Sequence, residues 1–230
     1  MNTELEKEAE DVAPVEQELH EPLTPDEVYP VVLAAGASSR MGSPKAGLDF
    51  GGQTALARIL ETCAELGLGE PVVVTGAHPE ETRAAAGDHA ARFVRNARWE
   101  TGRTSSLQRG LLAIPGDASA VLLWPVDACL PGVEVVTELV AALTHTPNAQ
   151  AAVPCHDRHR GHPLLIGAEA LPRFLDLGPD ESARELVRTL AAEGRLVHVE
   201  VSEKSVLMNV NTPQDHTRWR LLAPRRRRGE

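Results

Sequence analysis

The stretch that decides the fold is Val31-Val-Leu-Ala-Ala-Gly-Ala-Ser-Ser-Arg-Met-Gly-Ser-Pro-Lys45, which begins apolar and ends polar. The apolar run over residues 29–33 predicts a short buried strand, and the segment after it predicts a loop that leads into a helix near Thr54. A strand, a glycine loop and a helix in this order commonly present backbone N–H groups to a phosphate. Arg40 contributes a planar fork of donors and Lys45 a mobile charge, so the loop is suited to a polyphosphate.

Two familiar phosphate loops do not fit this stretch. A P-loop has Gly-Lys followed by Ser or Thr, whereas Gly42 is followed by Ser-Pro-Lys. A dinucleotide loop has the spacing G-x-G-x-x-G, whereas five residues separate Gly36 from Gly42. Both glycines lack a Cβ, so the chain can turn left-handed there and approach an anion closely. The structural alternative is an ordinary strand-to-helix turn that carries surface charges.

The rest of the chain alternates between strand and helix patterns. Residues 54–66 have an amphipathic helical pattern that Gly67 ends. Strands are expected over 71–75, 91–95, 120–126, 151–154, 196–201 and 206–210. Because strands that alternate with helices form parallel sheets with right-handed crossovers, we predict one α/β domain with a mostly parallel central sheet.

The pattern L-A-A-G-x-S-x-R-M-G-x-P-K, read from Leu33 to Lys45, resembles the signature loop of nucleotidyltransferases of the molybdenum cofactor cytidylyltransferase type. The resemblance extends in motif order to about residue 219 and implies a single-domain Rossmann-like, GT-A-like fold, a three-layer sandwich. It implies a cradle for the nucleotide phosphates in the loop, with catalytic roles for Arg40 and Lys45. It also implies that a G-x-x-x-S-L segment lines the nucleotide pocket. The nucleotide-binding residues expected on this basis are Leu33, Ala34, Ala35, Gly36, Ser38, Ser39, Met41, Gly42 and Ser106.

Two elements of the resemblance imply Mg2+ as cofactor. Asp127 follows an apolar strand, where open α/β sheets bind ligands, and it matches the metal-binding and catalytic Asp of a V-D-x-P-L-V element. Cys129 stands where that element has Pro. Asn211, in Asn-Val-Asn-Thr-Pro, matches the second metal ligand, and an amide oxygen is an acceptable donor for a hard cation. The alternative for Asp127 is a helix N-cap.

The contacts expected with the second substrate come from two later segments. Gly161, His162 and Pro163 match a G-H-P-x-L element that contacts this substrate in the resembled family. A zinc site built from three histidines of the same loop is the alternative, but regular ligand facing needs a helix rather than a polar loop. Arg184 precedes an apolar helix, where it could bind an acidic substrate group or remain a surface charge.

The resemblance implies transfer of a nucleoside monophosphate to a phosphate-bearing acceptor, with release of pyrophosphate. Leu-Ala-Ala-Gly is the cytidylyltransferase form and favours CTP with molybdopterin, whereas Asn209-Val-Asn211 is closer to the guanylyltransferase form. The alternatives are a GTP-using guanylyltransferase, a nucleotidyltransferase for a sugar phosphate or another small phosphate, and a non-catalytic nucleotide-binding protein. A molybdoenzyme or cofactor-insertion partner is compatible with the resemblance, and we expect a monomer or weak dimer.

Composition divides the chain of 230 residues into three parts. Residues 1–28 hold ten acids and one Lys, which predicts a disordered acidic arm or a docking tail for a basic partner. Residues 29–222 form the expected domain, and residues 223–230 a basic tail with four Arg. The net charge of the central part is weakly negative, so we expect no nucleic-acid partner. Three unpaired Cys predict a reducing cytoplasm, and no apolar run reaches the ~18 residues of a membrane span.

Overall fold

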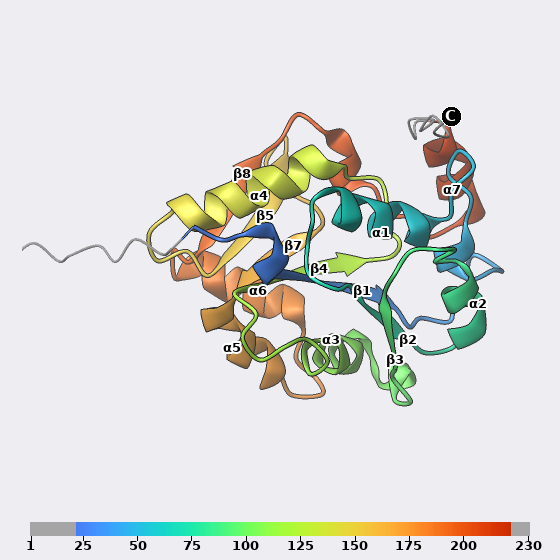
Figure 1. The fold of residues 1–230 in the computed structure, drawn as a ribbon, viewed down its shortest axis with the longest axis horizontal. Helices are drawn as coiled ribbons and strands as arrows, with labels where there is room; N and C mark the ends of the chain where they lie inside the picture. The colour runs from blue at the N-terminus through green and yellow to red at the C-terminus, as the bar shows by residue number, and fades with distance from the viewer. Residues whose placement is uncertain (1–21, 222–230) are drawn as a thin grey trace, which may run out of the picture.

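The computed structural model describes residues 22–221, which form three layers with a sheet between two layers of helices (Figure 1). The fold predicted from the sequence, one α/β domain with a mostly parallel sheet, is confirmed. Residues 1–21 of the expected acidic arm and all of the expected basic tail, residues 223–230, lie outside the described residues. Residues 22–28, which we assigned to the arm, include the short helix η1 (Pro25–Glu27) and the first residue of a strand.

The first half of the sheet is parallel and contains the strand that precedes the glycine loop. Its strands are β1 (Val28–Ala34), β2 (Val72–Thr75), β3 (Arg92–Arg95) and β4 (Ala120–Pro125), in the order β3-β2-β1-β4. Most residues of the three inner strands are buried on both faces, as their near-continuous apolar sequences predict. The carboxyl ends of these strands therefore meet at one edge of the sheet.

The second half of the sheet contains one strand that runs in the opposite direction. β7 (Leu164–Gly167) is antiparallel to β4 on one side and to β5 (Ala151–His156) on the other. β5 also pairs in parallel with β8 (Leu196–Glu200) and antiparallel with the two-residue strand β6 (His159–Arg160). Because β7 is reversed, the residues before it lie at the same edge of the sheet as the residues after β4.

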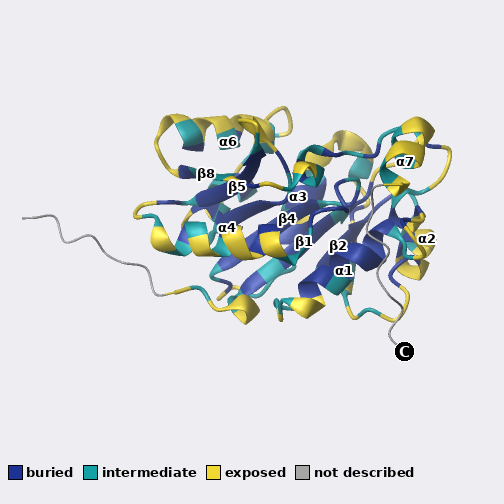
Figure 2. Ribbon diagram, turned by 90° about the horizontal axis from the view of Figure 1, so that it is seen from above, coloured by how far each residue is buried: buried dark blue, intermediate teal, exposed yellow. Residues whose placement is uncertain are grey.

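Helices cover both faces and enclose two apolar cores (Figure 2). The helices on the first face are α1 (Ala55–Glu65), α2 (Pro79–Ala84), α4 (Val133–His145) and α7 (Pro213–Arg220). Those on the second face are α3 (Arg103–Leu111), α5 (Leu171–Leu175) and α6 (Ala183–Ala192). Short 3-10 turns connect several elements, namely η2 (Lys45–Gly47), η3 (Trp99–Thr101), η4 (Ala168–Ala170) and η5 (Lys204–Leu207).

The strand predicted over 206–210 is wrong, because this segment begins in η5 and continues as an extended connection. Its backbone bonds to two different loops instead of to one neighbouring strand. The Val206 carbonyl accepts from the His162 N–H at 2.9 Å, and the Val210 N–H donates to the Asp127 carbonyl at 2.8 Å. The segment therefore ties the loop before β7 to the turn after β4.

Candidate functional site

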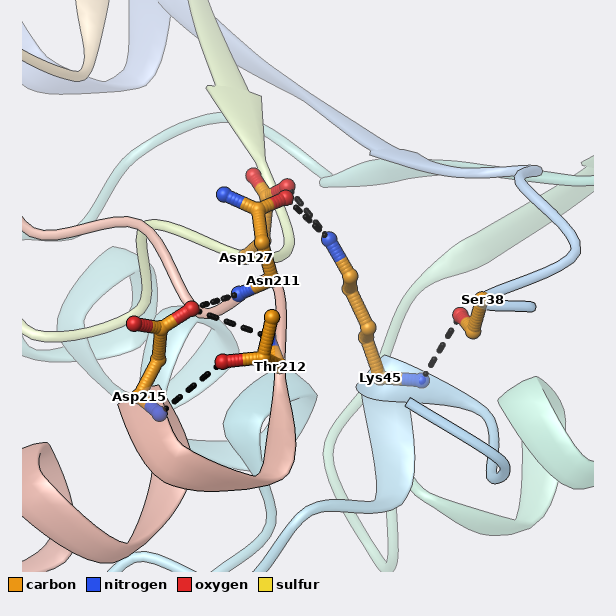
Figure 3. Close-up of polar contacts among 6 residues, drawn as sticks. All are labelled: Ser38, Lys45, Asp127, Asn211, Thr212 and Asp215. Carbon is orange, nitrogen blue, oxygen red and sulfur yellow. Dashed lines mark hydrogen bonds and ion pairs between the residues drawn. The ribbon is translucent and has the colours of Figure 1, made fainter. Parts of the chain in front are cut away.

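Lys45 connects three segments that are far apart in the sequence. Its Nζ donates to Asp127 Oδ2 at 2.8 Å and to Asn211 Oδ1 at 2.9 Å (Figure 3). The side chains of Lys45 and Asp127 are only 15% and 18% exposed, so solvent screens this ion pair less than a surface pair. The loop cation and the two predicted metal ligands therefore meet at one point.

The glycine loop folds back on itself to place Lys45. The N–H groups of Met41 and Gly42 both donate to the Ser38 carbonyl, at 2.8 and 3.2 Å. The Ser38 hydroxyl accepts from the Lys45 N–H at 3.2 Å. Gly42 is left-handed with φ of 76°, as expected, but the second left-handed residue of the loop is Ser38, with φ of 53°, and not Gly36. A serine with left-handed backbone angles is uncommon, and here it lies in a tight turn in which its own carbonyl accepts both of these N–H groups.

Asp127 is held by the turn that follows β4. The Val126 N–H donates to the Leu33 carbonyl at 3.1 Å, which fixes this turn against the end of β1. The buried Trp124 indole donates to the Ala128 carbonyl at 2.7 Å. Cys129, which replaces the expected Pro, is also buried, and burial raises the pKa of its thiol to about 12. The substitution therefore adds a protonated, apolar group beneath the turn rather than a reactive thiolate.

Asn211 is positioned by the start of α7. Thr212 caps this helix, and its hydroxyl accepts from the Asp215 N–H at 3.2 Å. Asp215 Oδ2 accepts from the N–H groups of Asn211 and Thr212, at 3.0 and 2.9 Å. Hydrogen bonding to the Asn211 backbone and to Thr212, together with the charge of Lys45, holds the pKa of Asp215 below its ordinary value. α7 begins at Pro213, and the cap fixes the backbone of Asn211.

A cavity of about 360 Å3 opens beside Lys45, at the carboxyl ends of β1 and β4. It brings together most of the loop residues that we expected to bind nucleotide. The predicted site residues that line it are Leu33, Ala34, Ala35, Gly36, Ser38, Ser39, Arg40, Lys45, Ser106, Asp127 and Asn211. Met41 is instead buried under the loop, and Gly42 forms its turn, so these two shape the loop and do not line the cavity.

The residues expected to contact the second substrate do not line this cavity. Gly161 lies so close to the chain that a Cβ there would be 2.4 Å from the Val206 carbonyl oxygen. Burial lowers the pKa of His162, an effect that the charge of Arg103 strengthens and that of Asp127 opposes. The neutral form of His162 is therefore favoured, and Pro163 next to it leads into β7. Arg184 is exposed in the first turn of α6.

The three histidines considered as a zinc site do not converge. The His156 Nδ1 contacts the Val201 carbonyl at 3.0 Å, and the His159 Nδ1 contacts the Asp157 carbonyl at 2.8 Å. Within residues 22–221 no group of three or more His, Cys, Asp or Glu side chains could hold a metal ion.

Cavity residues that the sequence analysis missed include His78, Thr82, Trp99, Glu100 and Arg103. His78 follows β2, and its Nε2 contacts the Ala37 carbonyl at 3.1 Å, which ties the glycine loop to the neighbouring strand. Trp99, Glu100 and Arg103 belong to the segment before Ser106. Asn96, at the end of β3, donates to both Ser105 and Ser106 at 2.9 Å and anchors this segment. The sequence feature that could have identified the missed residues is their position after consecutive parallel strands.

A parallel sheet with a glycine loop, two loop cations and an Asp at the end of the central strand defines a class, the nucleotide-binding α/β enzymes. Comparison with known proteins is more specific. Residues 30–196 match the MobA-like NTP transferase domain, and the chain belongs to this family of nucleotidyltransferases.

The relatives carry names of different activities. The chain is 34% identical over 171 residues to nicotine blue oxidoreductase of Paenarthrobacter nicotinovorans, an alignment that covers 69% of this chain and 80% of the relative. It is 28% identical over 197 residues to molybdenum cofactor guanylyltransferase of Rhizobium meliloti (80% and 87% covered). A solved nucleotidyl transferase from Methanothermobacter thermautotroptrophicus superimposes with a TM-score of 0.73 at 27% identity (85% and 96% covered).

Proposed function

We propose that this chain transfers a nucleoside monophosphate, CMP from CTP, to the phosphate of molybdopterin. The observation that carries the proposal is the position of Lys45, beside a cavity lined by the glycine loop and hydrogen-bonded to Asp127 and Asn211. Support for CTP over GTP comes from Ala35, which lines the cavity and completes the Leu-Ala-Ala-Gly form of the loop.

The chemistry requires cations around the phosphates and no general base. An acceptor phosphate oxygen attacks the α-phosphorus of the triphosphate, and the bond from that phosphorus to the bridging oxygen breaks. Pyrophosphate leaves with the electron pair, and the ionised acceptor needs no deprotonation. Arg40 and Lys45 are the cavity cations from the glycine loop, and they would neutralise charge that builds up on the phosphoryl oxygens.

Asp127 and Asn211 fit Mg2+ as joint ligands. Both side chains direct one oxygen toward the same point, where Lys45 Nζ now lies. Mg2+ in such sites takes one or two protein oxygens and fills its remaining positions with substrate phosphates and water, so two donors suffice. The ion would supply charge neutralisation to the phosphates. Binding of the ion by both oxygens would require Lys45 to release them, which leaves its ammonium for a phosphate.

The experiment is exchange of labelled pyrophosphate into each of the four nucleoside triphosphates in the presence of molybdopterin as acceptor, with and without Mg2+, preceded by a thermal-shift panel of the same triphosphates. We expect exchange with CTP above that with GTP, and none without the ion. In Asp127→Asn, which keeps the size of the side chain but removes its charge, Mn2+ binding in the presence of a non-hydrolysable triphosphate should weaken at least ten-fold. No exchange with any triphosphate would contradict nucleotidyl transfer to molybdopterin, whereas exchange with GTP alone would reassign the base.

An oxidoreductase is the second candidate, favoured by the 34% identity to nicotine blue oxidoreductase. A nicotinamide dinucleotide, which also carries phosphates, would be the reductant suited to the same cavity. Oxidation of NADH or NADPH in the presence of a quinonoid dye would identify this activity. The two candidates differ in their response to Lys45→Ala, because only phosphoryl transfer needs the lysine to stabilise a transferring phosphate.

A further inference from the structure

Among the described residues, a basic segment lies along the open edge of the sheet. Residues 82–116 contain six Arg and only two acids, although the whole chain has a net charge of −10. β3 is the last strand on this side, so its outer backbone groups face no other strand of the sheet. Four arginines surround it and are here called the arginine strip: Arg83, Arg92, Arg95 and Arg109.

Contacts in the structure hold the strip against β3. The guanidinium of Arg83 lies 4.4 Å from the centre of the Phe93 ring. Arg109 Nε donates to the Arg95 carbonyl at 3.3 Å, and Arg92 Nη1 donates to the Ala113 carbonyl at 3.1 Å. Among the described residues, one acid forms an ion pair with the strip, at 3.1 Å between Glu70 and Arg92. Three of the four guanidinium groups are thus held in place, and one of them is paired with an acid.

Some backbone N–H groups of β3 point away from β2, toward the open edge of the sheet. The N–H groups of Arg92 and Asn96 donate to Pro71 and Thr75, at or next to β2, at 2.8 Å each. Because alternate residues of a strand face opposite neighbours, the N–H groups of Phe93 and Arg95 point to the open edge. An extended chain can pair with such an edge. Pairing with the β3 of a second copy would bring arginine against arginine, so the strip selects for an acidic segment.

We propose that residues 1–21 of this same chain dock on the arginine strip as an added, acidic strand. This segment carries eight acids and one Lys, which complements the strip. It is joined to the body at Pro22, close to the start of β1, and β1 lies two strands, or about 10 Å, from β3. Its 21 residues span up to about 70 Å when extended, which is enough to reach the strip.

Because residues 1–21 and the strip belong to one chain, even weak binding between them would leave a large fraction of chains docked. A flexible tether gives an effective concentration on the order of 1 mM. A dissociation constant of about 0.5 mM between the separate parts would therefore leave most chains docked. The attraction is electrostatic at exposed groups, so salt should weaken it strongly. The docking does not depend on the reaction that the cavity performs.

The first test uses a fluorescent peptide of residues 1–21 and a chain that starts at residue 22. We expect anisotropy to report a dissociation constant of about 0.5 mM or lower at low salt, and at least ten-fold weaker binding in 0.5 M NaCl. The double variant Arg95→Gln/Arg109→Gln should weaken binding at least five-fold. The matched control is Arg188→Gln/Arg195→Gln, which removes the same charge on and just after α6, at the other end of the sheet, and should change binding less than two-fold.

The second test uses the full chain and hydrogen exchange. At low salt, docking beside β3 should slow exchange at the Phe93 amide about three-fold relative to the chain that starts at residue 22, as expected when about two thirds of the chains are docked, and 0.5 M NaCl should remove the difference. Equal exchange in the two chains would overturn the proposal. Equal weakening by the two double variants would also overturn it, because the attraction would then belong to the net charge and not to the strip.

Discussion

At the scale of single residues, Lys45 and Arg40 are both loop cations but their surroundings differ. Lys45 is mostly buried and contacts Asp127 and Asn211, whereas Arg40 is exposed at the cavity. An interaction that strengthens in the transition state affects kcat, and one that is equal in both states affects KM. We expect Lys45→Ala to lower kcat by about 100-fold or more, the scale of a lost charge-stabilising donor.

Arg40→Ala should instead mainly raise the KM for the nucleotide. Steady-state kinetics on both variants, with melting temperatures as a control for folding, checks the two predictions together. If Lys45→Ala keeps the wild-type kcat at saturating triphosphate, the lysine only binds the nucleotide and its catalytic role is wrong.

The sequence predicted Lys45, Asp127 and Asn211 because each belongs to a motif with a fixed local geometry. The loop, the strand end and the helix cap could each be located from a few neighbouring residues. His78, Trp99 and Arg103 could not, because their path depends on packing between distant segments. For example, Gly76 approaches the end of β1 so closely that a Cβ there would lie 2.3 Å from the Ala35 carbonyl oxygen.

At the scale of elements, the start of α7 controls where Asn211 lies. Asp215→Ala removes the acceptor for the Asn211 and Thr212 N–H groups and should cost about 1 kcal/mol, the usual value of a helix cap. For a chain of this size, the melting temperature should fall by about 2–4 °C. The control is Gln214→Ala, at an exposed position in the same turn, which should leave the melting temperature unchanged.

The same variant has a predicted pH dependence. The folded state lowers the pKa of Asp215, so its contribution is fully present above the ordinary Asp value of about 3.9. It is lost as pH falls through the lower folded value. The gap in melting temperature between wild type and Asp215→Ala should therefore be constant near neutral pH and close in strong acid. A gap that widens on acidification would contradict the assigned direction of the shift.

α3 depends on a glycine for its distance from the sheet. A Cβ at Gly110 would lie 2.3 Å from Val31 Cγ1 and 3.0 Å from Val74 Cγ2. Gly110→Ala should destabilise by about 1–3 kcal/mol through overpacking, although alanine favours the helix itself. Thermal melting checks this, with Gly116→Ala as the control because nothing lies within 4 Å of that position. Val31→Ala removes the methyl group that this Cβ would meet. It should therefore lower the free energy of unfolding less in the Gly110→Ala background than in the wild type, which a double-mutant cycle measures.

At the scale of the whole molecule, the boundary of the acidic arm can be set more sharply than composition allowed. Thr24 donates through its N–H and hydroxyl to Glu27 Oε2, at 2.9 and 2.7 Å, and the Glu27 carbonyl accepts from the Ser119 N–H at 3.2 Å. Leu23 packs against the core. Composition could not detect these contacts, because they depend on one apolar residue and on a distant turn.

Deletions that differ by six residues should therefore behave differently. Removal of residues 1–21 should leave the melting temperature within about 1 °C at physiological salt, since screening weakens exposed charge contacts. Removal of residues 1–27 should cost about 2 kcal/mol in lost burial and hydrogen bonds, or about 4–8 °C. Both deletions should keep the wild-type kcat, because β1 carries the cavity at its other end. Equal melting temperatures would show that the contacts of Leu23 and Glu27 contribute nothing.

The segment from Val206 to Val210, which bonds to the loop before β7 and to the turn after β4, is made late during synthesis. A ribosome makes Lys45 166 residues, and Asp127 84 residues, before it makes Asn211. Until then, the loop before β7 and the turn after β4 lack the segment that holds them together through the carbonyls and N–H groups of these two valines. A nascent chain stalled before residue 206 would thus contain every strand of the sheet and most of the cavity wall, yet Lys45 would have one partner instead of two.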